Sequence, residues 1–331
     1  MRITTLSKRN QNKISCRYNA YGFSGVVIWL VHVAKYIFLK EIRRKKFYTR
    51  KIHDYRLKLN LTDPGIAREL VVNGTREDQL RRLLQCEIKT GMTILDIGAN
   101  IGYYPLMVAN LAGDSGFVYA IEPSPSNYQN LIENIELNNK GKNFEVFNMG
   151  VSNKKGKERF FLSTHSNLNT FIRDGYKGGY VTCGVSDEFI DIEVTDLTSF
   201  LQGRNEVDLI RMDVEGYEVE ILEGLMDAIR SGLFRGTIIF ECHFPKYDEE
   251  QHSISKQLKM LFENGYRVKA LTSTDERKST MRDFGYEPDE VILTGGIEEG
   301  IYYSVSNDDA VKLISQHGGI RDAVFAKNGS K

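Results

Sequence analysis

The sequence predicts an α/β fold in which a mostly parallel sheet is covered by helices on both faces. From residue 91 onward, short apolar runs alternate with stretches of helical periodicity, which is typical of parallel strands joined by right-handed crossovers. Residues 61–331 are sufficient for one large domain with a sizeable core. Six prolines and no Gly/Ser-rich run argue against a flexible string of domains. The four cysteines have no CxxC spacing, which argues against a zinc ribbon or a disulfide framework.

Five apolar runs are the expected first strands of this sheet. They are residues 93–97, 117–121, 144–147, 207–212 and 237–241. Apolar residues at helical spacing predict helices after the second and fourth strands, over 127–137 and 218–229. Three later runs, at 266–271, 301–305 and 323–326, are expected to complete the sheet. The polar segments 163–169 and 176–180 are interpreted as solvated loops, with a substrate-facing flap at 163–169 and a sugar-stacking segment at 176–180 as the less favoured alternatives.

Charge divides the chain at residue 60. Residues 1–60 carry 15 basic and two acidic residues, a net charge of +13, which leaves 29 basic and 42 acidic residues in 61–331. A basic arm ahead of an acidic body usually contacts a polyanion. We therefore predict a basic helical arm over 1–60 and one domain over 61–331. Within that domain we expect a lead-in at 61–90, a core at 91–271, and C-terminal strands with an insertion at 272–331.

The arm contains the most apolar stretch of the chain, residues 23–39. This stretch is short for a membrane span of about 20 residues, it includes His32 and Lys35, and basic residues flank it on both sides. Three interpretations stay open: a spanning or interfacial anchor on anionic lipid, a helix packed on its own domain, and an arm for nucleic acid. The anchor interpretation predicts a cytoplasmic body associated with a membrane through residues 23–58.

The candidate chemistry lies at the carboxyl ends of the predicted strands, where open α/β sheets bind ligands. The first strand ends in DIGANIG, in which Asp96 precedes Gly98, Asn100 and Gly102. Glycines there allow a tight turn and a close backbone approach, and the next helix start offers unpaired amides. Glu122 ends the second strand, where a carboxylate can accept hydrogen bonds from both hydroxyls of a ribose.

Three details favour S-adenosylmethionine over a dinucleotide as the ligand. The loop reads DxGxNxG and lacks the GxGxxG spacing that brings backbone against a pyrophosphate. Asp96 would repel a phosphate but suits a cofactor with an ammonium and a sulfonium. Asp213, Glu215 and Glu218 continue the negative rim after the fourth strand. Taken singly, these features also fit a tight turn or a capped helix start, and it is their order at successive strand ends that favours a cofactor site.

The stretches DIGANIGYY (96–104), EPSPSNYQNLIENIELNN (122–139) and RMDVEGYEVEILEGL (211–225) together resemble the FkbM-type methyltransferases. The likeness spans roughly residues 61–270. It implies a Rossmann-like class I methyltransferase with a seven-stranded, mostly parallel sheet whose final strand is antiparallel. It also implies S-adenosylmethionine as cofactor and hydroxyls of sugars or polyketide-like products as acceptors.

The resemblance further implies a role for each residue of the cofactor site. These residues are Asp96, Gly98, Asn100 and Gly102 at the methionine end, Glu122, Pro123 and Ser124 at the ribose, Val151 and Ser152 at the adenine, and Asp213 at the junction with the acceptor.

An alcohol acceptor must also lose a proton, and the candidate catalytic residues Asp213, Glu241 and His243 leave two routes open. His243 can act as a general base with a pKa near neutrality. Alternatively, Asp213 and Glu241 hold a divalent cation such as Mg²⁺, an arrangement similar to that of metal-dependent small-molecule O-methyltransferases. A purely structural histidine is the plain alternative for His243.

The sequence thus predicts an S-adenosylmethionine-dependent methyltransferase, O-directed, with a glycan, glycolipid or other small-molecule acceptor. One alternative is an RNA methyltransferase that grips phosphates with the basic arm. It would normally carry an Asn/Asp-Pro-Pro-aromatic motif, which this sequence lacks, so nucleic acid is the less favoured partner. The other alternative is a non-catalytic binding module that has kept the fold.

Overall fold

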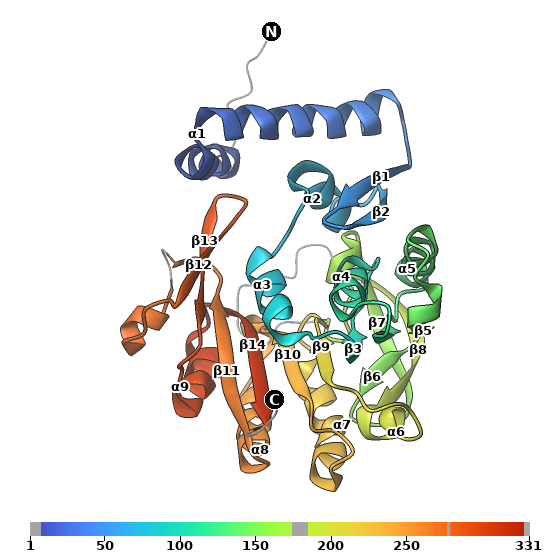
Figure 1. The fold of residues 1–331 in the computed structure, drawn as a ribbon, viewed down its shortest axis with the longest axis vertical. Coiled ribbons are helices and arrows are strands. Elements are labelled where there is room, and N and C mark those ends of the chain that lie inside the picture. Colours follow the sequence, from blue (N-terminus) through green and yellow to red (C-terminus); the bar gives the residue numbers. More distant parts are fainter. Residues whose placement is uncertain (1–7, 174–184, 277–278, 328–331) are drawn as a thin grey trace.

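The computed structural model describes residues 8–173, 185–276 and 279–327, and its centre is a nine-stranded sheet (Figure 1). The strands, in their order across the sheet, are β12 (Glu290–Thr294), β13 (Ile297–Tyr302), β11 (Tyr266–Ser273), β14 (Ile320–Lys327), β10 (Thr237–Glu241), β9 (Leu209–Met212), β3 (Thr93–Ile97), β4 (Phe117–Ile121) and β5 (Phe144–Phe147). The five expected first strands are all present. The predicted loop at 176–180 lies outside the described residues.

Seven of these strands have the arrangement that the family resemblance implies. β5, β4, β3, β9 and β10 run parallel to one another. β14 lies between β10 and β11 and is antiparallel to both. The prediction of a Rossmann-like, mostly parallel sheet is therefore confirmed. The hairpin β12–β13 adds two antiparallel strands beyond β11, so the sheet has nine strands where seven were expected.

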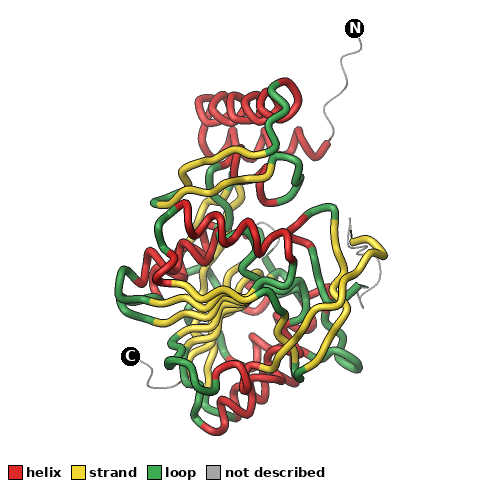
Figure 2. Tube along the Cα trace, turned by 90° about the vertical axis from the view of Figure 1, so that its right-hand side faces the viewer, coloured by secondary structure: helices red, strands yellow, loops and turns green. Residues whose placement is uncertain are grey.

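Helices cover both faces of the sheet (Figure 2). One face carries α3 (Asp78–Glu87), α4 (Tyr103–Ala112) and α5 (Pro125–Leu137), and the other carries α6 (Leu197–Leu201), α7 (Glu218–Ser231), α8 (Ile254–Glu263) and α9 (Asn307–Lys312). Each face has its own cluster of buried apolar side chains. The fold is thus a three-layer helix–sheet–helix arrangement.

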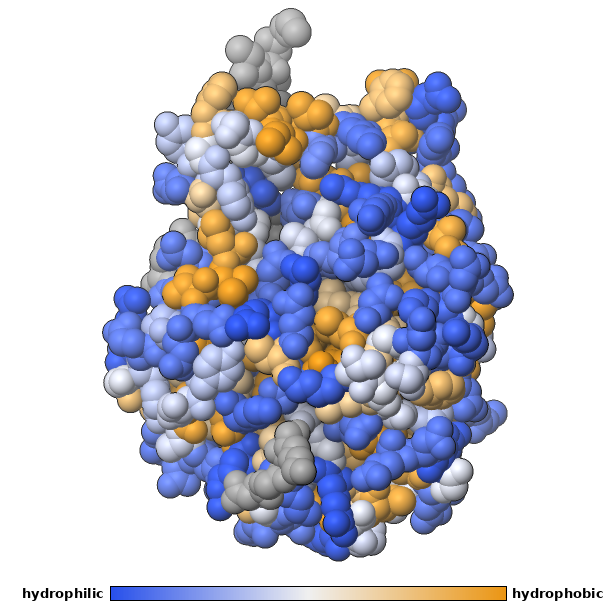
Figure 3. Space-filling view, viewed as in Figure 1, coloured by the Kyte–Doolittle hydropathy of each residue, from blue (hydrophilic) through white to orange (hydrophobic). Residues whose placement is uncertain are grey.

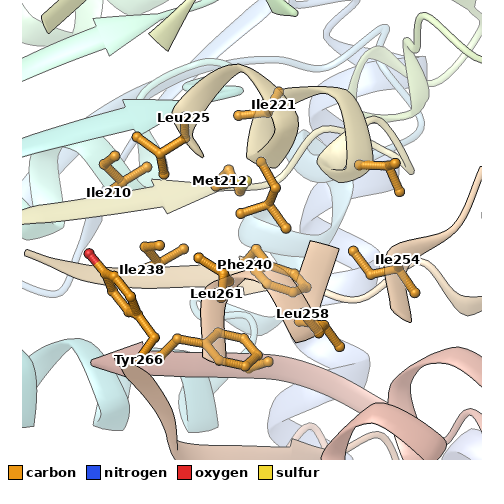
Figure 4. Packing of buried hydrophobic residues seen from close by; sticks show 14 of the residues in the cluster. Ile210, Met212, Ile221, Leu225, Ile238, Phe240, Ile254, Leu258, Leu261 and Tyr266 are labelled. Atoms are coloured by element: carbon orange, nitrogen blue, oxygen red, sulfur yellow. The ribbon is translucent and has the colours of Figure 1, made fainter. Parts of the chain in front are cut away.

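Alternation along the buried strands supplies both cores. Ile238 and Phe240 of β10 belong to the cluster under α7 and α8, and Ile239 between them belongs to the opposite cluster. This follows from the two-residue period of a strand. Figure 4 shows Ile238 and Phe240 together with Leu225 of α7 and Leu258 of α8. Burying each such side chain stabilises the folded state by roughly 1.5–3 kcal/mol. This core therefore holds the strand ends in place.

Residues 8–60 form a helix, a short π-helical turn η1 (Phe38–Ile42) and then a hairpin. The N-terminal elements are α1 (Lys8–Ile37), β1 (Phe47–Ile52), β2 (Tyr55–Asn60) and α2 (Ile66–Asn73). Leu57 and Leu59 of β2 are fully buried in the cluster that also holds α2 and α4, and the Tyr55 hydroxyl donates to the carbonyl of Tyr103 at 2.7 Å. The division at residue 60 stays a prediction, but the hairpin shares its core with the body.

A small second sheet is inserted between β5 and β9. It consists of β6 (Gly150–Ser152), β8 (Val185–Asp196) and β7 (Gly156–Ser163), with β8 in the middle. After β7 the chain continues through a short 3-10 turn, η3 (Ser166–Leu168). We call residues 163–172 the flap, because they border the cavity described below.

Candidate active site

The loop between β3 and α4 holds a glycine where no side chain fits. Gly98 has a φ of +79°, and a Cβ atom there would lie 1.9 Å from the carbonyl oxygen of Asp213. The amides of Gly98 and Ala99 both donate to the carbonyl of Ile121 at 3.0 Å. The ends of β3, β4 and β9 therefore meet at Gly98.

Glu122, at the end of β4, is fixed by backbone amides. Its Oε2 accepts the N–H of Asn100 at 2.8 Å, and its Oε1 accepts the N–H of Ser124 at 2.9 Å. Asn100 has a φ of +50°, uncommon for a residue other than glycine, and this conformation aims its N–H at the carboxylate. Burial raises the pKa of Glu122 to about 7 in spite of these donors. The remaining lone pairs are available to ribose hydroxyls.

These groups border a cavity of about 790 Å³, its open mouth included. The predicted cofactor residues that line it are Gly98, Asn100, Glu122, Pro123, Val151 and Asp213. Those that lie behind the wall are Asp96, Gly102, Ser124 and Ser152. The hydroxyl of Ser124 caps α5, and that of Ser152 lies 3.0 Å from the hydroxyl of Tyr217.

The flap borders one side of the cavity, in agreement with the less favoured of the two interpretations of residues 163–169. Its lining residues are Ser166, Asn167, Asn169 and Phe171. The Ser166 hydroxyl donates to Asp63 Oδ2 at 2.6 Å, and the Thr170 hydroxyl donates to the carbonyl of Glu215 at 3.1 Å. Polar composition alone does not separate a flap from a solvated turn. The sequence signal that could have indicated the flap is the aromatic segment of β7 just before it, because aromatic side chains need neighbouring residues to pack against.

Arg211 is the buried centre of the site, and the sequence analysis gave it no role. Its Nη1 lies 3.1 Å from Asp96 Oδ1, its Nη2 lies 3.0 Å from Asp213 Oδ2, and its Cζ lies 4.0 Å from the ring centroid of Tyr104. Asp96 was expected to face the positive charge of the cofactor. Its carboxylate is instead fully buried against Arg211. The sequence signal for this site is an arginine inside a buried strand, because a buried positive charge must be paired with acidic groups.

His243, just after β10, is surrounded by carboxylates. Its Nδ1 lies 2.8 Å from Glu218 Oε1, and its Nε2 lies 3.5 Å from Glu215 Oε2 and 3.9 Å from Asp213 Oδ1. Desolvation alone would lower the pKa of His243, but Glu218 and Glu215 outweigh it and raise that pKa well above its ordinary value. These carboxylates therefore favour the charged imidazolium, which opposes the general-base role predicted for His243.

Glu215 combines a place in the cavity wall with a pKa near neutrality. Its desolvation, reinforced by Asp213 and Glu218 and opposed by His243, raises the pKa of Glu215 to about 7. Its φ of +52° is a left-handed conformation of the kind found at functional sites. Glu241 is the last residue of β10, the strand next to β9. Desolvation and the nearby Asp213 raise the pKa of Glu241 well above its ordinary value.

The three predicted catalytic residues lie together. Asp213, Glu241 and His243 each place one ligand atom within 4.8 Å of the others. The protein already supplies cations to this cluster, since Arg211 pairs with Asp213 at 3.0 Å and Arg321 lies 3.5 Å from Glu241. Mg²⁺ prefers oxygen ligands, and the carboxylates of Asp213 and Glu241 already have these arginines as partners, so the arrangement gives the predicted Mg²⁺ site no support.

The strand order with its reversed β14, and the cavity at the ends of β3, β4 and β9, define a Rossmann-like methyltransferase fold. Residues 96–268, more than half of the chain, match the family described as the methyltransferase FkbM domain. The chain belongs to this family, as its motifs indicated. No curated protein matches the sequence.

Solved structures with a related fold include three methyltransferase-like proteins. The FkbM methyltransferase of Methylobacillus flagellatus KT is 14% identical, with a TM-score of 0.36, over 72% of this chain and 54% of that chain. TYW2 of M. jannaschii in complex with AdoMet is 17% identical, with a TM-score of 0.39, over 86% and 87%. Aeropyrum pernix fibrillarin with bound S-adenosyl-L-methionine is 12% identical, with a TM-score of 0.35, over 76% and 74%. At this level of similarity they say nothing about the reaction of this chain.

Proposed function

We propose that this chain transfers a methyl group from S-adenosylmethionine to a hydroxyl of a glycan, a glycolipid or another small-molecule acceptor. The observation that carries the proposal is the cavity, because it brings the glycine loop, Glu122, Asp213 and Glu215 around one space. Membership of the FkbM family supports methyl transfer. The carboxyl groups of Glu122, Asp213 and Glu215 in the cavity wall support the proposal, since it needs one group for the ribose and another for the acceptor's proton.

When bound, S-adenosylmethionine supplies an electrophilic methyl group on a sulfonium centre. Glu122 is proposed to accept the ribose hydroxyls, with Asn100 at the methionine end and Val151 at the adenine. A cationic ligand suits this cavity. Glu122 and Glu215 both have raised pKa values, and a nearby positive charge favours the ionised form of each carboxyl group.

We assign Glu215 as the general base that accepts the proton of the acceptor hydroxyl. A carboxyl group with a pKa of about 7 is partly ionised at neutral pH and well matched to general-base work. Glu215 would accept the proton that the acceptor hydroxyl loses when it is methylated. His243, whose Nε2 lies 3.5 Å from Glu215 Oε2 and whose pKa the surrounding carboxylates raise, positions this carboxylate. Asp213, whose carboxylate is held by Arg211, lies where the acceptor hydroxyl is proposed to bind.

This mechanism contains no metal-dependent step. Incubation with EDTA followed by gel filtration is therefore expected to leave turnover unchanged. A loss of turnover that Mg²⁺ restores would contradict the assignment and reinstate Asp213, Glu241 and His243 as a metal centre.

The acceptor and its location are proposed together. An enzyme held in the cytoplasm at a membrane surface through residues 23–58 encounters glycolipids and lipid-linked glycans at high local concentration. RNA remains the alternative acceptor, and a non-catalytic module remains the alternative to an enzyme.

The test is methyl transfer from radiolabelled S-adenosylmethionine into a fractionated lysate of the source organism. Label is expected in the lipid or glycan fraction, with S-adenosylhomocysteine released, and Glu215→Gln should abolish both. Label in RNA would support the alternative acceptor. An absence of transfer and of S-adenosylhomocysteine in every fraction would contradict the proposal.

A further inference from the structure

The helix α1 has two apolar faces, and its inner face is covered by the protein. The inner face consists of Val26, Trp29, Val33 and Tyr36. Val26 is buried, Tyr36 belongs to the core cluster of the hairpin and α2, and Trp29 and Val33 pack against that cluster. The Tyr36 hydroxyl donates to the carbonyl of Leu61 at 3.4 Å, and His32 Nδ1 lies 3.0 Å from the carbonyl oxygen of Val72. This face is therefore fixed on the body.

The other apolar face is open to solvent. We call it the outer stripe, and it consists of Phe23, Val27, Leu30, Val31 and Ala34 of α1 together with Phe38 of the π-helical turn that follows it. Phe23 is 74% exposed and Val31 is 60% exposed, unusual values for such side chains in a helix that already packs through another face. At 3.6 residues per turn these positions fall on the side turned away from the inner face. Figure 3 shows hydrophobic residues gathered at the top of the molecule, where α1 lies in Figure 1.

A block of exposed positive charge follows the stripe directly. Arg43, Arg44, Lys45 and Lys46 are all exposed, and residues 1–60 carry a net charge of +13. A second copy on the stripe would bring two such segments together, and their charges would repel. An anionic bilayer satisfies both features, since apolar side chains enter the interface and each nearby Lys or Arg strengthens the attraction severalfold.

Residues 15–42 are long and apolar enough to cross a membrane by length and composition, but the structure argues against a span. Crossing would strip Trp29 and Tyr36 from the core and expose His32 to hydrocarbon. Gly22, with φ 65° and ψ −169°, also breaks the helix at the start of the apolar segment. We infer that α1 lies flat on an anionic bilayer, with its inner face on the protein and its outer stripe in the lipid interface.

This orientation places the cavity close to the lipid. α2 connects the two, because Asn73 at its end accepts a hydrogen bond from Arg17 of α1 at 2.9 Å, and Ile66 at its start lines the cavity. A helix of eight residues is about 12 Å long. This step rests on the proposed function: a lipid-linked acceptor reaches the cavity without leaving the membrane surface.

The test is sedimentation of the full chain with vesicles of phosphatidylcholine alone or mixed equally with phosphatidylglycerol. Binding is expected to the mixed vesicles. It should fall at least ~10-fold in the double variant Val27→Glu, Val31→Glu, and by a similar factor when Arg43, Arg44, Lys45 and Lys46 all become Gln. Leu137→Glu, another exposed apolar position, is the matched control and should bind normally.

Quenching by brominated lipid then separates a flat helix from a span. Trp29 is the only tryptophan in the sequence and lies on the inner face, so bound protein should be weakly quenched. A Val31→Trp variant in a Trp29→Phe background should be strongly quenched. Strong quenching of Trp29 would show a span and overturn the inference.

Two further outcomes would also overturn it. One is full-length protein that stays in the supernatant with both kinds of vesicle. The other is a dimer that Val27→Glu and Val31→Glu dissociate, which would show a second copy on the stripe. Calorimetry with S-adenosylmethionine on the same preparations keeps a failure of membrane binding distinct from a failure of the proposed methyl transfer.

Discussion

Gly98 is the residue at which the site tolerates least change. A Cβ there would lie 1.9 Å from the carbonyl of Asp213, at a φ that L side chains rarely adopt. We expect Gly98→Ala to lower the free energy of unfolding by roughly 1–3 kcal/mol and to weaken cofactor affinity at least ~10-fold, because the ends of β3 and β9 must separate. Denaturant titration and calorimetry measure both effects.

Gly141→Ala is the matched control for this change, since a Cβ at Gly141 meets nothing within 4 Å. Equal stability of the two variants would show that β3 and β9 do not meet as described.

The pairing of Glu215 with His243 predicts the sign of a pH shift. The imidazolium lies 3.5 Å from Glu215 Oε2 and opposes the desolvation that raises the pKa of Glu215, which leaves that pKa at about 7. In His243→Gln the pKa of Glu215 should rise, and the ascending limb of the pH–rate profile should move to higher pH. A downward shift or an unchanged profile would rule out this positioning role.

At the scale of elements, the flap is held by a few polar contacts. Thr170 donates its hydroxyl to the carbonyl of Glu215 and accepts the N–H of Ile172 at 3.0 Å. Thr170→Val keeps the shape but removes both bonds, at a cost of about 1–3 kcal/mol. Hydrogen exchange of residues 163–172 should therefore accelerate about tenfold or more. Thr49→Val, at an exposed site in β1, should leave the flap unchanged, and equal exchange in both variants would show that Thr170 does not anchor it.

The elements that the sequence predicted well are those whose pattern reflects burial on both faces. The strands at 93–97 and 117–121 are continuous apolar runs, and the structure has them at these residues. β7 and β8 were missed because charged residues interrupt both, for example in GKERFFLS. Their stability comes from pairing with each other, and a pairing between segments more than twenty residues apart leaves no local periodicity.

The candidate site was predicted in part for a similar reason. Gly98 and Glu122 stand at strand ends, where position alone suggests a role, and both line the cavity. Arg211 lies inside a strand, and its importance appears only once Asp96 and Asp213 are placed on either side of it. The pKa of His243 likewise depends on Glu218 and Glu215 approaching across the loop, a distance that sequence spacing does not give.

At the scale of the whole molecule, the net charge of the segments does not show at which residue the packed core begins. The count of +13 extends to residue 60, yet Leu57 and Leu59 are fully buried. The basic side chains of β2 alternate with apolar ones, so one face of the hairpin is charged and the other belongs to the core. A charge count averages over both faces.

The buried acids also give the whole molecule a characteristic pH dependence. Desolvation raises the pKa of Glu122, Glu215 and Glu299 to about 7 and that of Asp322 to about 6. Between their ordinary values and these folded values, the native state binds more protons than the unfolded state, so stability falls as pH rises through this window. His243, whose pKa is raised, acts in the same direction.

We therefore expect the melting temperature to fall by ~5 °C or more between about pH 5 and pH 8. Differential scanning calorimetry in buffers of matched ionic strength measures this change. A melting temperature that rises over the same interval would show that these carboxyl groups are ionised and compensated in the native state.

The most direct measurement is calorimetric titration of the full chain with S-adenosylmethionine from pH 6 to pH 8. One molecule should bind per chain, more tightly as Glu122 ionises through its pKa of about 7, because the carboxylate then accepts both ribose hydroxyls. Glu122→Gln should lose roughly 10- to 100-fold in affinity and show a weaker pH dependence. Absence of binding at every pH, or equal affinity in the variant, would contradict an S-adenosylmethionine site built on Glu122.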